Sequence, residues 1–580
     1  MDNRVVSNSE VKKALGLHGA FGSLMVDLGY YVCGFHKVVK YIGNAKEYQG
    51  QEFVDRFLDN MNVSADFDEN LLSNIPEKGG FVVVCNHPFG GIEGLLLYHV
   101  VSKIRPDFKL MGNYILSMIP NLKDSIFGVN PFTSNPKWSD SKKGLRASIL
   151  HLAEGHGLGI FPAGEVSRYH GKLYPEDLPW SSSIARLVKN AGVPVVPVFW
   201  RGQNSRLFYR LDKIHEMLGT ARLPRELANK HDQCFSMQIG SAISADEIAR
   251  YKQPEDLATY LRARTYALEA NLDWPAQETA DTTPVDVSVV SSEISLEISR
   301  IREKALLYSM ADYDCLMVDY EDAPLLMNEI FSLREQTFRS VGEGTGKSLD
   351  RDRFDSYYKH IVVWDNAKQQ IAGSFRFGMG KDIIQSKGIN GLIVSTLFDI
   401  DASFSEYLEK SIELGRFFIP GEYQKKGLPL RLLLRGLFVL AATYPEVEYF
   451  IGPASVSRLY PKFYLSLIME YLNRKHHVES GLENKLTPHH PFQPDFLKAD
   501  VEALLTKNMD SIDQFDKFMF RLSNRKSRLP SLLRKYLKLN AKVLGFNIDT
   551  LFNDSFDALL IARISDFPEN EVLPLMRTTL

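Results

Sequence analysis

Short apolar runs alternate with stretches of helical periodicity through the first half of the chain. Three runs rich in β-branched and aromatic residues predict strands, at Phe81 to Cys85, Leu158 to Phe161 and Val195 to Phe199. Two stretches with apolar residues at helical spacing predict helices, at Ser141 to Glu154 and Ser181 to Asn190. Strands that alternate with helices in this way are typical of an α/β layer domain.

The alternation resumes in the second half of the chain, after a change of composition. The segment from residue 273 to about residue 292 is rich in Thr, Ser, Pro and acids and has no helical period, which predicts a linker. The predicted elements beyond it are the helices Ala323 to Phe338 and Leu430 to Thr443 and the strands His360 to Trp364, Ile371 to Phe377 and Ile412 to Ile419. We therefore expect an α/β fold in two domains, 1–272 and 293–580.

Length, charge and cysteine content are consistent with this organisation. A chain of 580 residues is longer than one hydrophobic core usually accommodates. The formal net charge of -3 gives no whole-chain field that would favour nucleic acid. Four cysteines show no spacing typical of zinc, a redox pair or a disulfide framework, at Cys33, Cys85, Cys234 and Cys315. A reducing cytosol fits this pattern, and the first 30 residues do not resemble a signal peptide.

The first predicted strand runs directly into a segment with candidate catalytic chemistry. Asn86-His87 follows the strand, and the glycine pair Gly90-Gly91 precedes the carboxylate of Glu93. An imidazole at the mouth of a strand, oriented by a nearby acid, can act as general base toward a hydroxyl. The alternative for His87 is a structural histidine that caps the strand end.

A second loop follows the second predicted strand. Phe161-Pro162-Ala163-Gly164-Glu165-Val166-Ser167-Arg168 contains a glycine turn, an acid and a base, and a Val-Pro-rich strand comes later at Gly192 to Val198. Together with the His87 segment, these blocks resemble the glycerolipid acyltransferase family, which uses acyl thioesters to acylate a lipid hydroxyl. Family members usually have four residues between the histidine and an aspartate, whereas five residues separate His87 from Glu93 here.

The resemblance implies roles for the residues in these blocks. His87 and Glu93 would be catalytic, and the acceptor would be bound by Asn86, Gly164, Glu165, Ser167 and Arg168. Arg168 and Glu165 can instead pair with each other at the surface, which would contribute about 0 to 1 kcal/mol. The nearby histidines lack metal-ligand spacing, so we expect no metal.

Candidate chemistry in the second half is spread over several motifs. Arg334 and Phe338 share one face of a predicted helix, and a glycine-rich loop at residues 341–346 leads to Asp350, Asp352 and Asp355. This loop lacks the register and the preceding strand of a phosphate-binding loop. The blocks Glu413 to Arg416 and Gln424 to Pro429 follow, and the second of these precedes a helix whose first turn can bind phosphate.

These motifs resemble the GNAT N-acyltransferases, and in particular their ornithine-lipid branch, although Pro429 replaces the usual final small residue of the signature. The resemblance implies a 3-hydroxyacyl donor on acyl carrier protein, or acyl-CoA, and no tightly bound cofactor. Gln424, Lys425, Lys426 and Gly427 would bind the donor. Arg334, Asp352, Asp355 and Arg416 would bind the amino acid. For the first three, the alternatives are a role in organising the acyl site and a surface charge network. Glu413 would take the proton of its amine, with a structural Glu413–Arg416 pair as the alternative.

The whole chain is thus similar to the bifunctional ornithine lipid synthases. The C-terminal domain would N-acylate an amino acid, and the N-terminal domain would then esterify the resulting hydroxyl. Ornithine is preferred by resemblance, but lysine, glycine and glutamine present the same amine. The alternatives are a glycerophospholipid acyltransferase with a degenerate C-terminal half and a non-catalytic, haemolysin-like membrane-binding protein.

Two features predict attachment to a membrane from one side. Residues 9 to 45 carry apolar groups at helical spacing, suited either to packing on their own domain or to a membrane surface. Residues 517 to 542 interleave cations with aromatic and aliphatic residues, which suits an anionic membrane surface or acidic acyl carrier protein better than nucleic acid. No apolar stretch approaches the ~20 residues needed to span a bilayer. We expect a protein on the inner face of the bacterial cytoplasmic membrane.

Overall fold

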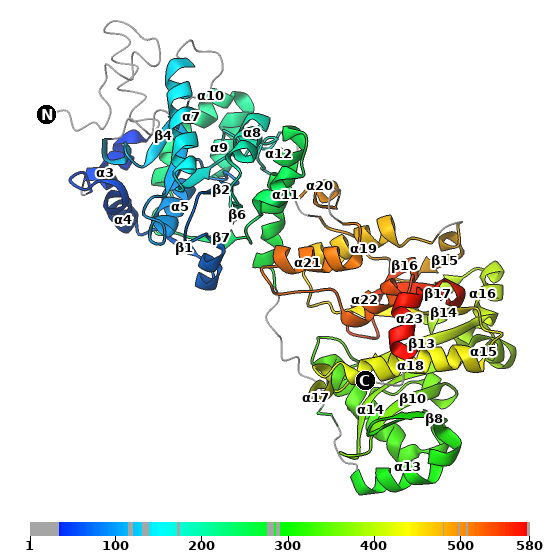
Figure 1. Cartoon of the computed structure of the whole chain (residues 1–580). Helices are drawn as coiled ribbons and strands as arrows, with labels where there is room; N and C mark the ends of the chain where they lie inside the picture. Colours follow the sequence, from blue (N-terminus) through cyan, green and yellow to red (C-terminus); the bar gives the residue numbers. More distant parts are fainter. Residues whose placement is uncertain are drawn as a thin grey trace, which may run out of the picture. The chain divides into compact units, whose positions relative to one another are not determined.

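The computed structural model describes most of the chain as two compact units. The described residues are 34–43, 45–113, 120–129, 138–170, 174–274, 284–285, 291–478, 481–496, 499–505 and 509–576. The first unit comprises Met1–Asp273, Phe496–Met509 and Lys517–Ser527, and the second comprises the remaining residues. Segments from late in the chain therefore complete the first unit (Figure 1).

The first unit is built on a seven-stranded sheet with the order β1-β7-β6-β2-β5-β3-β4. The strands are β1 Ser64–Asp66, β2 Phe81–Cys85, β3 Lys109–Asn113, β4 Ile126–Val129, β5 Gly157–Ile160, β6 Val195–Trp200 and β7 Cys234–Ile239. All neighbouring pairs are parallel except β6 and β7. Every residue of β2 is buried, which explains why this central strand reads as a continuous apolar run.

Helices surround this sheet in the first unit. They are α3 Phe35–Gly43, α4 Gly50–Met61, α5 Ile92–Ser102, α7 Trp138–Ala153, α8 Ser182–Ala191, α9 Arg206–Ile214, α10 Glu216–Ala228, α11 Ala245–Ala249, α12 Pro254–Tyr266 and α20 Val501–Leu505. The predicted strands and helices of this half are confirmed, with ends that differ by a few residues. Val82 pairs with Leu158 on one side and Val195 on the other. The loop that follows the carboxyl end of β2 therefore begins at the middle of the sheet.

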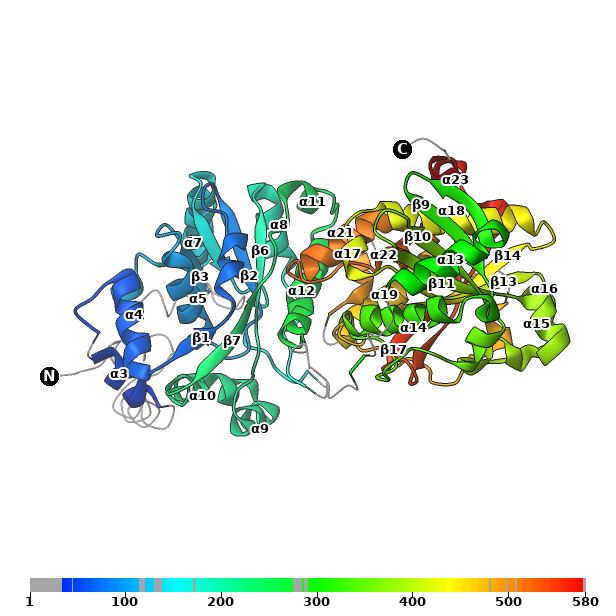
Figure 2. The same cartoon turned by 90° about the horizontal axis from the view of Figure 1, so that it is seen from below.

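The second unit contains an eight-stranded sheet with the order β16-β17-β14-β13-β11-β10-β9-β8, part of which is visible in Figure 2. Its strands are β8 Leu306–Met310, β9 Tyr313–Val318, β10 Lys359–Asp365, β11 Gln370–Met379, β13 Ser411–Phe418, β14 Tyr449–Val456, β16 Lys542–Asp549 and β17 Ser555–Arg563. A separate pair is formed by β12 Phe398–Ile400 and β15 Leu486–Pro488. In the large sheet only β13 and β14 are parallel neighbours.

The helices of the second unit complete its mixed α/β architecture. They are α13 Ser291–Ala305, α14 Pro324–Arg339, α15 Gly380–Lys387, α16 Ser405–Glu409, α17 Gly421–Gln424, α18 Leu428–Thr443, α19 Lys462–Lys475, α22 Ser531–Lys538 and α23 Glu569–Met576. Helix α21, Ile512–Leu522, has residues assigned to both units. The helices and strands predicted for this half are confirmed.

Strands β13 and β14 pair only at their beginnings. Ser411–Glu413 of β13 pairs with Tyr449–Ile451 of β14, and the register ends there although each strand has eight residues. The later residues of both strands line a cavity of about 980 Å³. The separation of these two strands therefore creates the cavity. Beyond the paired residues, the backbone N–H and C=O groups of β13 and β14 do not hydrogen-bond to each other.

Some expectations concern residues outside this description. Residues 9–33 of the predicted membrane-proximal helices and most of the predicted linker, 275–283 and 286–290, lie outside the described residues. Within the part of the chain that is described, we find no helix whose length and hydropathy together would suit a bilayer crossing.

The close packing of Gly452 against Leu414, where β13 and β14 separate, leads to a prediction about stability. A Cβ atom added at Gly452 would lie 2.4 Å from the carbonyl oxygen of Leu414, whereas one at Gly421 would meet nothing within 4 Å. Gly452→Ala should therefore destabilise the protein by about 1–3 kcal/mol through overpacking. The measurement is thermal unfolding of the purified chain, with Gly421→Ala as the matched control. A Gly452→Ala midpoint no lower than that of the control would contradict this packing.

Candidate active sites

The end of β2 in the first unit places His87 against Glu93. The Nδ1 atom of His87 lies 2.9 Å from the Oε1 atom of Glu93, which is completely buried, while the imidazole remains partly exposed. The five-residue gap between them is therefore compatible with direct contact. Because Nδ1 faces the carboxylate, Nε2 is the ring nitrogen that can take a proton from an acceptor hydroxyl.

Glu93 also fixes the turn that carries His87. The backbone N–H groups of Phe89 and Gly90 donate to its Oε1 atom and that of Gly91 donates to its Oε2 atom, each at 2.8 Å. Gly90 has a φ of 86°, which a residue with a Cβ atom rarely adopts. The glycine pair thus lets the backbone turn around the carboxylate at the start of α5.

The two groups shift each other's pKa. Burial raises the pKa of Glu93, but the charge of His87 and the backbone donors outweigh burial and lower it to about 2. Burial lowers the pKa of His87, but the charge and hydrogen bond of Glu93 outweigh it, so that this pKa lies above its ordinary value. A carboxylate that stays ionised beside the imidazole stabilises the imidazolium formed when His87 accepts a proton.

Asn86 joins two strands beside this pair. Its Nδ2 group donates to the carbonyl oxygen of Trp200 at 2.9 Å, and its Oδ1 atom accepts from the backbone N–H of Trp200 at 2.8 Å. The side chain thereby continues the pairing of β2 with β6 beyond the end of β2. This placement favours a positioning role, whereas the predicted acceptor contact stays a prediction.

The second predicted loop lies directly against His87. The backbone N–H of Ser167 donates to the carbonyl oxygen of His87 at 2.8 Å. Asp177 then accepts from the backbone N–H of His87 at 3.1 Å, from the hydroxyl of Ser167 at 2.6 Å and from the Trp180 indole at 2.9 Å. Asp177 was not predicted, because it lies 90 residues from His87 in sequence and belongs to no recognisable motif.

Arg168 and Glu165 occupy less exposed positions than a surface pair would. Arg168 is 5% exposed, its Nε atom lies 3.5 Å from Glu165, and its other nitrogens contact Asp212 of α9 and Thr220 of α10. Gly164, with a φ of 74°, forms the turn of the loop. The loop therefore contacts His87 through Ser167, and its arginine connects the loop to α9 and α10.

In the second unit, three arginines and three aspartates form a buried charge network. Arg334 contacts Asp350 at 3.0 Å and Asp355 at 2.8 Å. Two further arginines complete the network: Arg376 contacts Asp352 and Asp355, and Arg416 lies 3.1 Å from Asp350. Burial raises the pKa of Asp355, but the arginines outweigh it and lower this pKa well below its usual range. The predicted residues Arg334, Asp352, Asp355 and Arg416 are thus brought together.

Arg376 is a member of this network that sequence reasoning missed. The signal was present, because Arg376 is a charged residue inside the apolar strand β11. A charge in such a strand needs partners, and its side chain is only 2% exposed.

Glu413 is placed differently from what its predicted role requires. It is 1% exposed, and its carboxylate accepts from the Tyr358 hydroxyl and from the backbone N–H groups of Ile393 at 2.8 Å and Val394 at 2.7 Å. Among the described residues, the lining of the cavity includes Leu414 but not Glu413. Glu413 therefore holds the loop after α15, and its role as proton acceptor stays an untested prediction.

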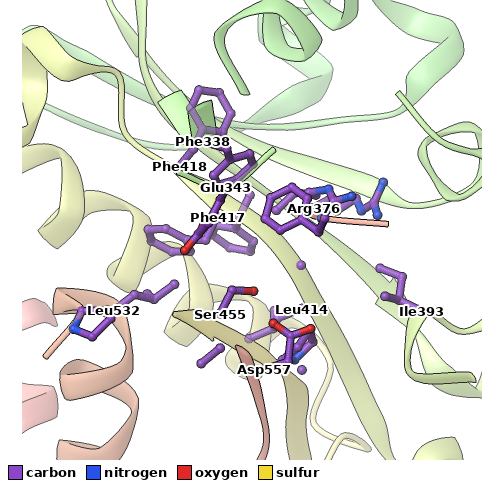
Figure 3. Close-up of a pocket in the computed structure, with 18 of the residues that line it drawn as sticks. Phe338, Glu343, Arg376, Ile393, Leu414, Phe417, Phe418, Ser455, Leu532 and Asp557 are labelled. Atoms are coloured by element: carbon purple, nitrogen blue, oxygen red, sulfur yellow. The ribbon is translucent and has the colours of Figure 1, made fainter. Parts of the chain in front are cut away.

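The cavity itself combines a polar region with an apolar region (Figure 3). The polar lining includes Glu343, Asp350, Asp352, Arg376, Arg416, Ser455, Asp549 and Asp557. The apolar lining includes Leu437, Phe438, Phe450, Tyr536, Leu560 and Phe567. Gln424, at the end of α17, and Gly427, directly before α18, also line it, while Lys425 and Lys426 between them are exposed.

Two histidines before β5, at the end of the sheet where β2 begins, are grouped more closely than their spacing suggested. Ligand-type atoms of His151, Glu154 and His156 lie within 4.8 Å of one another. The protein's own groups contact the two rings, because Nε2 of His151 lies 2.9 Å from the Asp107 carbonyl oxygen and Nδ1 of His156 lies 3.3 Å from the Asp107 carboxylate. These contacts explain how the rings are held.

The His87–Glu93 contact predicts a change in proton affinity. In Glu93→Gln the imidazole stays largely removed from solvent but loses the neighbouring charge, so its pKa should fall from above the usual 6.5 to below it. Titration of the His87 ring by NMR measures this value, and Glu154→Gln, which alters an exposed acid of the same unit, serves as the control. An unchanged His87 titration in Glu93→Gln would contradict the contact.

Comparison with known families agrees with the two sites. Residues 36–275 match the family model described as an acyltransferase, and residues 333–434 match the model described as an acetyltransferase (GNAT) domain. The first match contains the His87 and Ser167 loops, and the second contains the charge network from Arg334 to Arg416.

Individual relatives are consistent with both matches. A glycine N(alpha)-acyltransferase of Phocaeicola vulgatus is 28% identical over 306 residues, which cover 50% of this chain and 90% of the relative. Its counterpart in Bacteroides thetaiotaomicron is also 28% identical, over 51% of this chain and 89% of the relative. A lyso-glycine lipid O-acyltransferase of P. vulgatus is 25% identical over 235 residues, which cover 39% of this chain and 81% of the relative. The chain is an acyltransferase in which an N-terminal acyltransferase domain precedes a C-terminal GNAT domain.

Proposed function

We propose that this chain makes an acyloxyacyl amino-acid lipid through two successive acyl transfers. The GNAT domain joins a 3-hydroxyacyl chain to the α-amine of an amino acid, and the N-terminal domain esterifies the hydroxyl of that chain. The observation that carries the proposal is the presence of two separate acyl-transfer sites in one chain. Similarity to one relative named for N-acylation of glycine and to another named for O-acylation of a lyso-glycine lipid supports it.

The first site suits transfer to a hydroxyl. His87 takes the hydroxyl proton at Nε2, the hydroxyl oxygen attacks the thioester carbonyl carbon, and the C–S bond then breaks as the proton passes to the leaving thiolate. Glu93 stabilises the positive imidazolium between these two events. We propose that Ser167, whose backbone contacts His87, and the glycine turn at Gly164 bind the polar head of the acceptor.

The second site suits a long thioester donor. Backbone groups along β13 and β14, which no longer pair with each other, can hydrogen-bond the amide groups of an extended pantetheine arm. The start of α18, at Gly427, favours the phosphate of that arm because helical N–H groups converge there. The apolar part of the cavity would accommodate the acyl chain.

We propose acyl carrier protein as the physiological donor, with acyl-CoA as the competing form of the same thioester. Lys425 and Lys426 are exposed beside the start of α18, where an acidic carrier protein would have to place its phosphate. In the predicted basic stretch, by contrast, Arg528 and Arg534 contact Asp516 and Lys538 contacts Asp513. These ion pairs make the lysine pair at α18 the better site for the carrier.

We propose ornithine as the amino acid, on two grounds. The second half resembles the ornithine-lipid branch, and the carboxyl group of Asp549 also lines the cavity and would favour a second ammonium group. The relatives, in contrast, are named for glycine. The side chain of the amino acid is therefore the part of the proposal that needs a direct assay.

We also propose that the first unit binds the inner membrane surface through α9 and α10. These helices expose four large apolar side chains, Leu207, Ile214, Met217 and Leu218. Cations of α9 flank them, at Arg206, Arg210 and Lys213. Exposed apolar groups beside cations suit the interface of an anionic membrane. Because Asp212 of α9 contacts Arg168, this surface is joined to the loop at His87.

The proposed function predicts that the chain catalyses N-acylation of an amino acid in a purified assay. The purified chain should convert 3-hydroxyacyl carrier protein and ornithine into an N-acylated product that mass spectrometry detects. Glycine, lysine and glutamine are tested in parallel, with 3-hydroxyacyl-CoA as the alternative donor. A product with glycine alone would overturn the choice of ornithine, and the absence of any amide would overturn the proposed function.

If each site catalyses one of the two acyl transfers, disabling the esterification site should cause the mono-acylated amino acid to accumulate. In His87→Ala the base for esterification is lost, so cells that express this variant should accumulate the mono-acylated amino acid and lose the diacylated lipid by at least about 100-fold. Lipid extracts analysed by mass spectrometry give both quantities, and His170→Ala is the control. Loss of phosphatidate synthesis without any amino-acid intermediate would favour a glycerophospholipid acyltransferase instead.

If α9 and α10 bind the membrane, removing their exposed apolar side chains should weaken vesicle binding. Replacing Ile214 and Met217 by Ser removes two exposed apolar side chains and should weaken binding to phosphatidylglycerol vesicles by about tenfold or more. Vesicle co-sedimentation measures this, and Leu296→Ser, at an exposed position of the second unit, is the matched control. Equal binding by the double variant and the control would contradict this surface.

A further inference from the structure

The cavity of the second unit contains a buried carboxyl group that the motifs did not identify. Asp557 lies on β17, is 1% exposed and lines the cavity. By register it is paired with Ser455 of β14 on one side and with Asn547 of β16 on the other. Its Oδ1 atom has no hydrogen-bond partner within the described part of the chain. Figure 3 shows Asp557 and Ser455 projecting toward the same space.

A second carboxyl group reaches this cavity from the glycine-rich loop. Glu343 lies between Gly342 and Gly344, which have φ values of 80° and 101°, so the backbone adopts a conformation that favours glycine on both sides of it. The loop is held by Glu335, whose buried carboxylate accepts from the backbone N–H groups of Thr345 at 3.0 Å and Gly346 at 2.8 Å. This otherwise unexplained loop therefore directs Glu343 into the cavity.

The electrostatic surroundings of these two carboxyl groups favour the binding of a cation. Burial, together with the charges of Asp549 and Glu343, raises the pKa of Asp557 to about 8, against the lowering effect of the Ser455 hydrogen bond and the charge of Arg416. Burial likewise raises the pKa of Glu343 to about 7, against the effect of Arg416. An ammonium group that enters this space would stabilise both carboxylates, and a carboxyl group of near-neutral pKa exchanges protons efficiently at physiological pH.

The three aspartates of the charge network and Glu413 are already engaged. Asp350, Asp352 and Asp355 each contact at least one arginine. Glu413 is occupied by two backbone N–H groups and a tyrosine hydroxyl. The Oδ1 atom of Asp557, in contrast, is buried at the cavity without such a partner.

We propose that Asp557 binds the ammonium group of the amino-acid substrate and takes its proton, and that Glu343 is the second carboxylate of this ammonium site. The inference rests on the proposed N-acylation. The arginines of the charge network, Arg376 and Arg416, line the same cavity and would face the carboxylate of the amino acid.

The proposed step is balanced as follows. The Asp557 carboxylate removes one proton from the ammonium, which frees the nitrogen lone pair. The nitrogen attacks the thioester carbonyl carbon and forms the C–N bond. When the carbonyl re-forms, the C–S bond breaks, and the second proton of the nitrogen passes to the leaving thiolate. Asp557 then releases its proton to solvent, so that amide, free thiol and one proton are the products.

Asp557→Asn tests this assignment in the full chain. Its turnover number for amide formation should fall about 100-fold or more, with little change in the KM for the acyl donor. The deficit should shrink as the pH approaches the pKa of the substrate amine, because the amine then arrives uncharged. Thermal unfolding should occur at or above the wild-type midpoint, since the variant removes a buried carboxyl group whose Oδ1 atom has no hydrogen-bond partner among the described residues. Asp554→Asn, an exposed acid of the preceding turn, is the matched control.

A second variant separates binding from proton transfer. Glu343→Gln should raise the KM for the amino acid more than it lowers the turnover number. Turnover of Asp557→Asn within about threefold of wild type, with the same pH dependence, would overturn the assignment. An unchanged amino-acid KM in Glu343→Gln would overturn the ammonium site. If the wild-type chain forms no amide with any amino acid, the proposed function fails, and the assignment fails with it.

Discussion

The carboxylate of Glu93 is completely buried, and it is satisfied by three backbone N–H groups of the turn that precedes it. Burying a charge without such partners costs several kcal/mol, so the turn is constrained to the conformation that supplies them. The same physical device occurs twice in the second unit, where Glu335 holds the glycine-rich loop and Glu413 holds the loop after α15. The positions of His87 and Glu343 depend on these buried acids, because each lies on or beside a loop that such an acid fixes.

A buried acid of this kind can act in two ways, and the two units show both. Glu93 fixes a turn and also contacts the imidazole, so it contributes directly to the proton affinity of His87. Glu413 fixes a loop through similar contacts but does not line the cavity. The presence of an acid in a sequence motif therefore does not reveal which of these two roles it has until the surrounding loop is placed.

Much of the fold followed from apolar patterning. The central strand Phe81–Cys85 was predicted to the residue, because a strand buried on both faces is apolar throughout. The His87–Glu93 contact was also foreseeable, since both residues lie in one short segment. Asp177 and Asp557 were not, because their roles arise from contacts between segments that are distant in sequence. The glycine-rich loop was noticed as a motif, but its function as the support of Glu343 required the position of Glu335.

The central claim is that one chain carries out both acyl transfers in sequence. The most direct measurement is tandem mass spectrometry of lipids from a bacterial host that makes no amino-acid lipid and expresses the wild-type chain. The account predicts a new lipid whose fragments show an amino acid with an amide-linked 3-hydroxyacyl chain and a second acyl chain esterified to that hydroxyl. A host that gains no amino-acid lipid, although the folded protein is present, would contradict the account.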